Sequence, residues 1–286
     1  MVCIICKKTG GRICGNEDCL IRVEEIDQGS VIRNKILQDL ECSRFLMDLA
    51  VDAILSARWK DVFVPMPVSY KNLEHAELVR IATKVQHMWD EIVLTCTTGA
   101  DRDLHGLLGS AFIFLKFTMM SHLGQLSIVD LPAEMHPIRI FQVSNSEKKE
   151  KEFSSRSRGY KQFLYHGSSC ENWYSIIRNG LKNMSGSKWQ VNGRKFGNGI
   201  YAADIPAYSL GYTGGKNRII AVLEPSQNPI IWKKGAYYVI PDPADLIIRY
   251  LIVISYEDDQ KEVDFKFSET KLIQKVVQKL SAPKRK

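Results

Sequence analysis

The period of the apolar residues changes near Ile138, and this change limits the folds open to the chain. Upstream, apolar residues recur at steps of three and four, as in Leu46, Leu49 and Ala50, which is typical of one buried helix face. Downstream, short β-branched and aromatic runs are separated by Gly, Asn, Asp and Pro. The sequence therefore predicts helices followed by a mostly antiparallel, strand-rich module, an α+β arrangement.

The predicted helices begin at Ser43, which has the character of an N-cap, and continue over 73–93 and 107–123, with Pro65 and Pro67 closing the first. The predicted strands cover 138–143, 163–166, 200–203, 218–223, 229–232, 237–240 and 246–254. The segment 144–160 is rich in Lys, Glu, Ser and Arg, and we expect an exposed loop there. We accordingly divide the chain into a short cysteine-rich segment, 1–30, a helical region, 31–137, and the strand-rich domain, 138–286.

Hydrophobic residues make up 45% of the chain and charged residues 25%, as in globular proteins. We expect no membrane span, because no run of about 18 apolar residues exists. Seven cysteines and an N-terminus without an apolar signal core predict reduced thiols inside the cell, in cytoplasm or nucleus. The net charge of +7 could assist binding of a polyanion, and the sequence leaves nucleic-acid binding open.

The first candidate site lies where a predicted strand ends in His166-Gly167-Ser168. Ser168 and Glu171 have the spacing of a capping box, and Gly180 marks the end of the helix that would follow. A strand end next to a helix N-terminus presents free backbone N–H groups, which suit a polar or anionic ligand. A strand end with a structural histidine is the competing interpretation.

A glycine-rich segment, 184–198, leads into the second candidate site at Gly199-Ile200-Tyr201. Glycines there would allow a ligand to approach the backbone closely. A short helix from Pro206 would bring Ser209 and Tyr212 to one face. Two tyrosines could then enclose a flat heteroaromatic ring, although core packing explains any single tyrosine equally well.

These segments, together with an Asn172-Trp173 helix, occur in the order that resembles the catalytic domain of the poly(ADP-ribose) polymerase family, over about 138–286. The resemblance implies a split β-sheet that binds NAD in an extended cleft. It implies that the Gly167 backbone and Ser209 hold the nicotinamide amide, that Tyr212 stacks on the ring and Tyr201 lines its other side, and that His166 contacts the adenosine ribose. The candidate NAD-binding residues are His166, Gly167, Ser168, Gly199, Tyr201, Ser209 and Tyr212.

In polymer-forming members of that family, a glutamate near the end of the sheet activates the incoming hydroxyl. Counting back thirteen residues from Tyr250 gives Tyr237 that position, and strand alternation sends Tyr238 to the other face. A one-residue slip would exchange the two. A phenol with a pKa of about 10 is a poor base at neutral pH. With His166 and Tyr201, Tyr237 matches the His-Tyr-Tyr, mono-ADP-ribosylating branch, so we expect release of nicotinamide and transfer of one unit without elongation.

Four cysteines, Cys3, Cys6, Cys14 and Cys19, lie within seventeen residues and have spacings found in structural zinc sites. A segment this short would gain order from a metal, and it resembles a cysteine-rich segment of some mono-ADP-ribosylating members. Four ordinary reduced thiols are the alternative.

The leading interpretation is an NAD-dependent mono-ADP-ribosyltransferase that modifies protein side chains, with automodification of its own chain among the candidate reactions. The rivals are a catalytically inactive module that binds NAD or ADP-ribose, a zinc-dependent adaptor in which 1–30 dominates, and a transferase acting on RNA or DNA ends. The sequence does not identify the acceptor protein.

Overall fold

A computed structural model of the chain describes residues 29–98, 104–122, 126–129, 138–156, 163–185, 197–214, 217–226, 232–255 and 277. The chain divides into two compact units. The helical unit comprises Met1–Trp59 and Pro65–Leu123, and the sheet unit comprises Lys60–Val64 and Gly124–Lys286. Each unit is described by itself.

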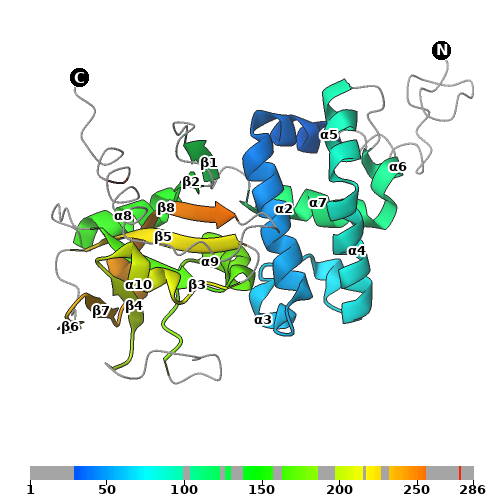
Figure 1. The fold of residues 1–286 in the computed structure, drawn as a ribbon. Coiled ribbons are helices and arrows are strands. Elements are labelled where there is room, and N and C mark those ends of the chain that lie inside the picture. The colour runs from blue at the N-terminus through cyan, green and yellow to red at the C-terminus, as the bar shows by residue number, and fades with distance from the viewer. Residues whose placement is uncertain are drawn as a thin grey trace, which may run out of the picture. The chain divides into compact units, whose positions relative to one another are not determined.

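The described part of the helical unit contains a helical stretch over 29–38 and then short to medium helices (Figure 1). They are α2 (Leu40–Leu55), α3 (Trp59–Val62, shared with the sheet unit), η1 (Val68–Tyr70), α4 (His75–His87), α5 (Trp89–Thr98), α6 (Leu104–Leu108), η2 (Gly109–Ala111) and α7 (Phe112–His122). The helical prediction for this region is confirmed.

Helix α2 is the most deeply buried element of the helical unit. Leu46, Leu49 and Ala50 are fully buried, as their spacing predicts. The predicted N-cap is wrong: Asp39 caps the helix by accepting a hydrogen bond from the Cys42 amide at 2.9 Å, and Ser43 is buried inside the first turn. The acidic side chain of Asp39 suits the positive end of the helix dipole.

The sheet unit is built on eight antiparallel strands within the described ranges (Figure 1). They are β1 (Leu126–Val129), β2 (Ile138–Val143), β3 (Leu164–Ser168), β4 (Ile200–Ala203), β5 (Asn217–Pro225), β6 (Trp232–Lys234), β7 (Tyr237–Ile240) and β8 (Leu246–Ser255), in the order β1-β2-β8-β5-β3-β4-β7-β6. The α+β prediction is confirmed. Strand β1 lies upstream of Ile138 and pairs with β2, so the sheet unit extends beyond the boundary that the sequence suggested.

Both faces of the central strands are buried. On one face, alternate residues of β2, β8, β5 and β3 pack with Leu210 of α10 (Pro206–Leu210) and with Val277. On the other face, residues such as Ile219 and Leu251 are fully buried as well. Near-continuous runs of β-branched residues in β5 and β8 therefore reflect burial from both sides.

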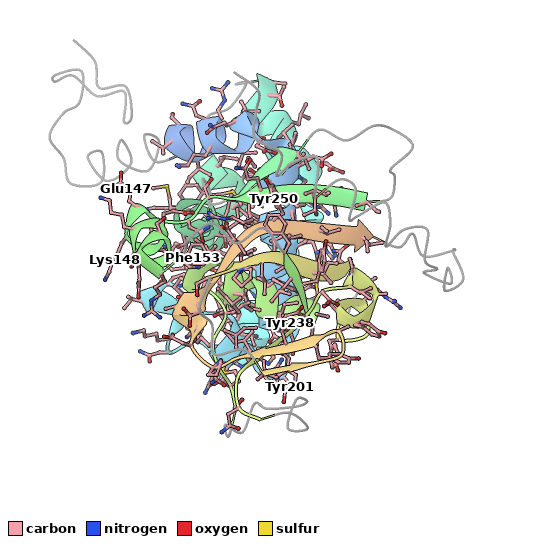
Figure 2. All side chains as sticks on the ribbon, turned by 90° about the vertical axis from the view of Figure 1, so that its left-hand side faces the viewer. Glu147, Lys148, Phe153, Tyr201, Tyr238 and Tyr250 are labelled. Carbon is pink, nitrogen blue, oxygen red and sulfur yellow. The ribbon has the colours of Figure 1, made fainter. Side chains whose placement is uncertain are left out.

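The expectation of an exposed loop over 144–160 is wrong in part. Helix α8 (Glu147–Arg156) occupies its centre, and Phe153 is its one buried side chain (Figure 2). Ser146 begins the helix by accepting from the Lys149 amide at 3.3 Å. The capping box at Ser168 is also wrong, because Ser168 ends β3, the turn η4 (Cys170–Asn172) follows it, and Asn172 precedes α9 (Trp173–Asn179).

Two further predictions concern the N-terminus and the membrane. The four N-terminal cysteines lie outside the described residues. Within the described ranges, no helix is both long and apolar enough to cross a bilayer.

Candidate active site

The site is built where β3 and β4 separate. The two strands pair at one position, Tyr165 opposite Ala203. One residue further along β3, the His166 ring extends towards β4, and its Nδ1 lies 2.7 Å from the Tyr201 carbonyl oxygen. The side chain thus takes the place of the next ladder hydrogen bond, and the sheet is split at the point where the sequence predicted the site.

The tautomer of His166 follows from this contact. A carbonyl oxygen only accepts, so Nδ1 carries the proton and donates it to Tyr201. Burial lowers the pKa of His166, and the bond to the Tyr201 carbonyl opposes that change. The imidazole is therefore neutral near pH 7, which leaves Nε2 as a hydrogen-bond acceptor. Trp173 supports the ring from α9, edge-on, with ring centroids 6.5 Å apart.

Gly167 joins β3 to α10 at close range. A Cβ added to Gly167 would collide with the Ser209 carbonyl oxygen and approach Thr213 Cγ2 to 3.3 Å. The same Ser209 carbonyl accepts from the Tyr212 amide at 3.1 Å. Only glycine permits this approach, so the structure brings Gly167, Ser209 and Tyr212 together.

Ser209 is itself 3% exposed and donates its hydroxyl proton to the Tyr165 carbonyl at 2.8 Å. A hydroxyl has one proton, so Ser209 can donate to another acceptor only by leaving Tyr165. Tyr212 lies beyond the last residue of α10 and is 47% exposed, which leaves its ring available for stacking.

Ser168 is held by two residues of the following turn and helix. Its hydroxyl accepts from Asn172 Nδ2 at 2.9 Å, and its carbonyl accepts from the Trp173 indole at 3.1 Å. The end of β3 is thus fixed by side chains that the capping-box prediction did not include.

Gly199 immediately precedes β4, and Tyr201 lies within that strand. A Cβ on Gly199 would lie 2.6 Å from Val239 Cγ1, so the space that this glycine leaves is filled by β7. The Gly199 amide donates to Ser185 Oγ at 2.8 Å, and the Tyr201 hydroxyl donates to the Gly197 carbonyl at 2.8 Å. These two bonds tie β4 to the described ends of the glycine-rich segment.

Tyr237 begins β7 and lies on the same face of the sheet as Tyr201. The register pairs Tyr201 with Val239 and Ala203 with Tyr237, and residues two apart share a face. Tyr238 faces the other way, is 4% exposed, and its hydroxyl lies 3.3 Å from Asp204 Oδ2 (Figure 2). Desolvation, Tyr212 and Tyr208 raise the pKa of Tyr237, so its phenol is protonated at neutral pH.

Two acidic residues that flank Tyr237 in the sequence, Glu224 and Asp242, are engaged elsewhere. Arg249 Nε contacts Glu224 Oε2 at 2.6 Å, and Arg156 contacts Asp242 Oδ2 at 2.7 Å. Both pairs lie around α8 and η5 (Pro243–Asp245). Neither carboxylate is therefore available to act as the base that a glutamate provides in polymer-forming members of the family.

Sequence reasoning missed Tyr208, whose ring contacts that of Tyr237 with centroids 5.2 Å apart. Its position next to Ser209 in a short helix is visible in the sequence, but nothing there separates it from a surface tyrosine. Ser185 was missed for the same reason, since its bonds to Gly199 span fourteen positions. Among the described residues, no group of three or more His, Cys, Asp or Glu side chains could hold a metal ion.

The comparisons with known proteins concern this same part of the chain. The family model for the poly(ADP-ribose) polymerase catalytic domain matches residues 128–223. Protein mono-ADP-ribosyltransferase PARP8 of Mus musculus is 27% identical over 179 residues, which are 49% of this chain and 21% of that protein. The Homo sapiens protein of that name is 34% identical over 112 residues, 38% of this chain and 13% of its own length.

A rice protein, poly [ADP-ribose] polymerase 2-B of Oryza sativa subsp. japonica, is 33% identical over 75 residues, 26% of this chain and 12% of that protein. The chain thus spans about a fifth or less of the length of these relatives. The matched region includes β2, β3, β4 and most of β5, and with them His166, Gly167, Tyr201 and Ser209. Residues 128–223 are therefore similar to the catalytic domain of the poly(ADP-ribose) polymerase family.

Proposed function

We propose that the chain is an NAD-dependent mono-ADP-ribosyltransferase that modifies protein side chains and releases nicotinamide. The observation that carries the proposal is the convergence of Gly167, Ser209 and Tyr212 beside the His166–Tyr201 contact. Two relatives bear the name mono-ADP-ribosyltransferase, which supports the same activity here.

In this proposal the nicotinamide ring lies between Tyr212 and Tyr201. The Gly167 backbone and the Ser209 hydroxyl bind its amide, and Ser209 exchanges the Tyr165 carbonyl for the amide oxygen as it does so. Neutral His166 accepts a hydrogen bond from a ribose hydroxyl on Nε2, while Nδ1 keeps donating to the Tyr201 carbonyl. Ser168 and Gly199 complete the proposed binding region. Asn172 holds the Ser168 hydroxyl, and Ser185 accepts a hydrogen bond from the Gly199 amide.

The chemistry is cleavage of the bond between nicotinamide and the ribose carbon. The bonding pair leaves with nicotinamide, and the carbon develops oxocarbenium character before the acceptor attacks. Groups that fix the ring and stabilise this charge distribution accelerate the step. Tyr237 stands where polymer-forming members have a glutamate, and its raised pKa excludes it as a base near pH 7. We therefore expect one ADP-ribose per acceptor site.

The proposal is tested by incubating the chain with NAD and measuring free nicotinamide and protein-bound ADP-ribose together. We expect both products, including automodified chain. Tyr212→Ala should raise KM for NAD, because the stacking ring is lost, while Tyr212→Phe should retain affinity. Since Tyr212 is half exposed, its truncation should leave the fold intact. NAD binding without nicotinamide release would support the inactive-module alternative.

Zinc binding by Cys3, Cys6, Cys14 and Cys19 stays a prediction from their spacing. Metal analysis of the pure chain should give about one zinc per molecule, and the variant with all four cysteines replaced by serine should give none. Well under one equivalent in the unaltered chain would contradict it. An intracellular acceptor protein is likewise our expectation, and the acceptor's identity would come from mass spectrometry of modified partners.

A further inference from the structure

Tyr208 is an aromatic residue beside the proposed site that the family resemblance leaves without a role. It lies in α10, one residue before Ser209, and is 45% exposed. Its ring contacts that of Tyr237, with centroids 5.2 Å apart and planes inclined by 45°. Aromatic pairs at this separation attract one another beyond their simple burial.

The geometry of α10 explains how Tyr208 reaches β7. Helix α10 packs on β3, β4 and β5, and the Ser209 hydroxyl binds the Tyr165 carbonyl beneath it. One step along a helix turns a side chain by about 100°, so Tyr208 points to the side when Ser209 points to the sheet. Since Ser209 is anchored, the direction of Tyr208 is fixed with it.

The Tyr208 ring makes a direct contact with the Tyr237 ring. In the sheet, Tyr237 lies opposite Ala203 of β4, whose methyl group covers little of a phenol ring, and opposite Lys234 of β6. The groups that act on the Tyr237 hydroxyl electrostatically are Tyr212 and Tyr208. The Tyr208 ring therefore gives Tyr237 a contact from α10 in addition to its neighbours in the sheet.

We propose that Tyr208 is a positioning residue that holds the Tyr237 ring at the acceptor side of the ribose, and so favours transfer to a protein side chain over hydrolysis by water. The inference rests on the proposed function, because that proposal puts Tyr237 beside the ribose carbon at which the reaction takes place. A protonated phenol cannot activate an acceptor, but a fixed aromatic wall can exclude water from an electron-poor carbon.

The two outcomes of the reaction differ in one bond. In both, the bond between nicotinamide and the ribose carbon breaks and nicotinamide keeps the electron pair. In transfer, an acceptor side chain forms the new bond to that carbon and gives up any proton it carried. In hydrolysis, a water oxygen forms the bond and loses one proton, which gives free ADP-ribose. The ratio of free to protein-bound ADP-ribose therefore reports how well water is excluded.

The experiment measures that ratio, and the rate of nicotinamide release, for the full chain and its variants at saturating NAD. Tyr208→Ala should raise the ratio of hydrolysis to transfer by about two- to tenfold, the range expected for one aromatic contact. Tyr208→Phe keeps the ring and should retain the original ratio. Tyr237→Ala should raise the ratio as well, and adding Tyr208→Ala to it should have no further effect, because both remove the same contact.

Leu94→Ala, which truncates an apolar residue that is 62% exposed in α5 of the helical unit, is the control and should change neither the ratio nor the rate. A lower thermal midpoint in Tyr208→Ala without a change in the ratio would indicate a purely structural residue and overturn the inference. An unchanged ratio in an active, fully folded Tyr208→Ala chain would overturn it too, with the proposed function intact. Absence of nicotinamide release by the unaltered chain would overturn the proposed function, and this inference with it.

Discussion

Gly167 is the residue on which the assembly of the site depends most directly. Its missing side chain allows the Ser209 carbonyl to lie against the β3 backbone, and Ser209 in turn binds Tyr165 and Tyr212. The sequence pointed to Gly167 as a ligand-binding backbone. The structure adds a second reason for glycine, since the chain's own α10 fills the space that a Cβ would need.

We predict that Gly167→Ala lowers NAD affinity and thermal stability, because backbone atoms of α10 must move to admit the methyl group. Gly211→Ala is the control: its Cβ would meet nothing closer than the Tyr208 carbonyl at 3.5 Å, and its φ of −63° suits alanine. NAD titration and thermal unfolding of both variants check the prediction. Equal behaviour of the two variants would contradict it.

His166 gives the site a pH dependence whose sign follows from the desolvation of its partly buried ring. Burial lowers the pKa of the native imidazole below the value of about 6.5 expected in the unfolded chain. As pH falls through 6.5, the unfolded chain binds a proton that the native chain does not, so the free energy of unfolding decreases. The contribution is fully present above that pH and is lost below it.

Urea unfolding at pH 7.5 and 5.5 therefore should show a smaller loss of stability on acidification for His166→Asn than for the unaltered chain. Asparagine retains a donor that can face the Tyr201 carbonyl and does not titrate. All other titrating groups are common to both chains, so the difference isolates His166. An identical pH-dependent loss in the two chains would refute this assignment.

At the level of elements, α8 shows what the sequence could not reveal. Most of its residues are charged, and one buried apolar side chain, Phe153, produces no helical period. The helix is fixed instead by contacts distant in sequence: Arg249 of β8 binds Glu150 of α8 and Glu224 of β5, and its guanidinium lies 5.6 Å from the Phe153 ring centroid. The strands were predictable, because β-branched runs bounded by turn residues carry their own signal.

We predict that Arg249→Ala destabilises the sheet unit by about 1–3 kcal/mol, because two carboxylates then face each other without a cation. This loss of stability is smaller than that expected for a fully buried ion pair, because the Arg249 side chain is 26% exposed. Arg80→Ala removes the exposed Arg80–Glu77 pair of α4 and should leave stability unchanged. Denaturant unfolding of both variants measures the contrast. A loss no larger for Arg249 than for Arg80 would show that the α8 cluster contributes nothing specific.

The candidate site was predictable to a similar degree. The motifs and the family resemblance together pointed to His166, Gly167, Tyr201, Ser209 and Tyr212, and the structure brings His166 to Tyr201 and Gly167 to Ser209 and Tyr212. Spacing could not identify Tyr208 or Ser185, because their contacts form only when α10 and β4 are placed on the sheet. The catalytic and binding roles of all these residues remain proposals that the experiments above address.

For the whole molecule, the division of the chain does not follow a single cut. Lys60–Val64 belongs to the sheet unit although Pro65–Leu123 belongs to the helical unit. Phe63 is fully buried, and its ring packs on Tyr174 of α9 with centroids 5.0 Å apart. Asn179 Nδ2 donates to the Val64 carbonyl at 3.1 Å. A chain that begins at Gly124 lacks both contacts.

Phe63→Ala should therefore destabilise the sheet unit by about 3–5 kcal/mol, as expected for a fully buried phenylalanine. Hydrogen exchange followed by mass spectrometry should show faster exchange in α9 and unchanged exchange in α4. Val68→Ala, at a residue that is 79% exposed, should leave both helices protected. Loss of protection confined to α4 in Phe63→Ala would contradict the assignment of this segment to the sheet unit.

We propose above that the chain attaches a single ADP-ribose and stops, because Tyr237 takes the position that a carboxylate needs for elongation. Mass spectrometry of the automodified chain, after incubation with NAD, tests it most directly. We expect peptides that carry one ADP-ribose per modified side chain and an equal amount of released nicotinamide, after correction for hydrolysis. Side chains carrying two or more linked units, or an unmodified chain without released nicotinamide, would contradict it.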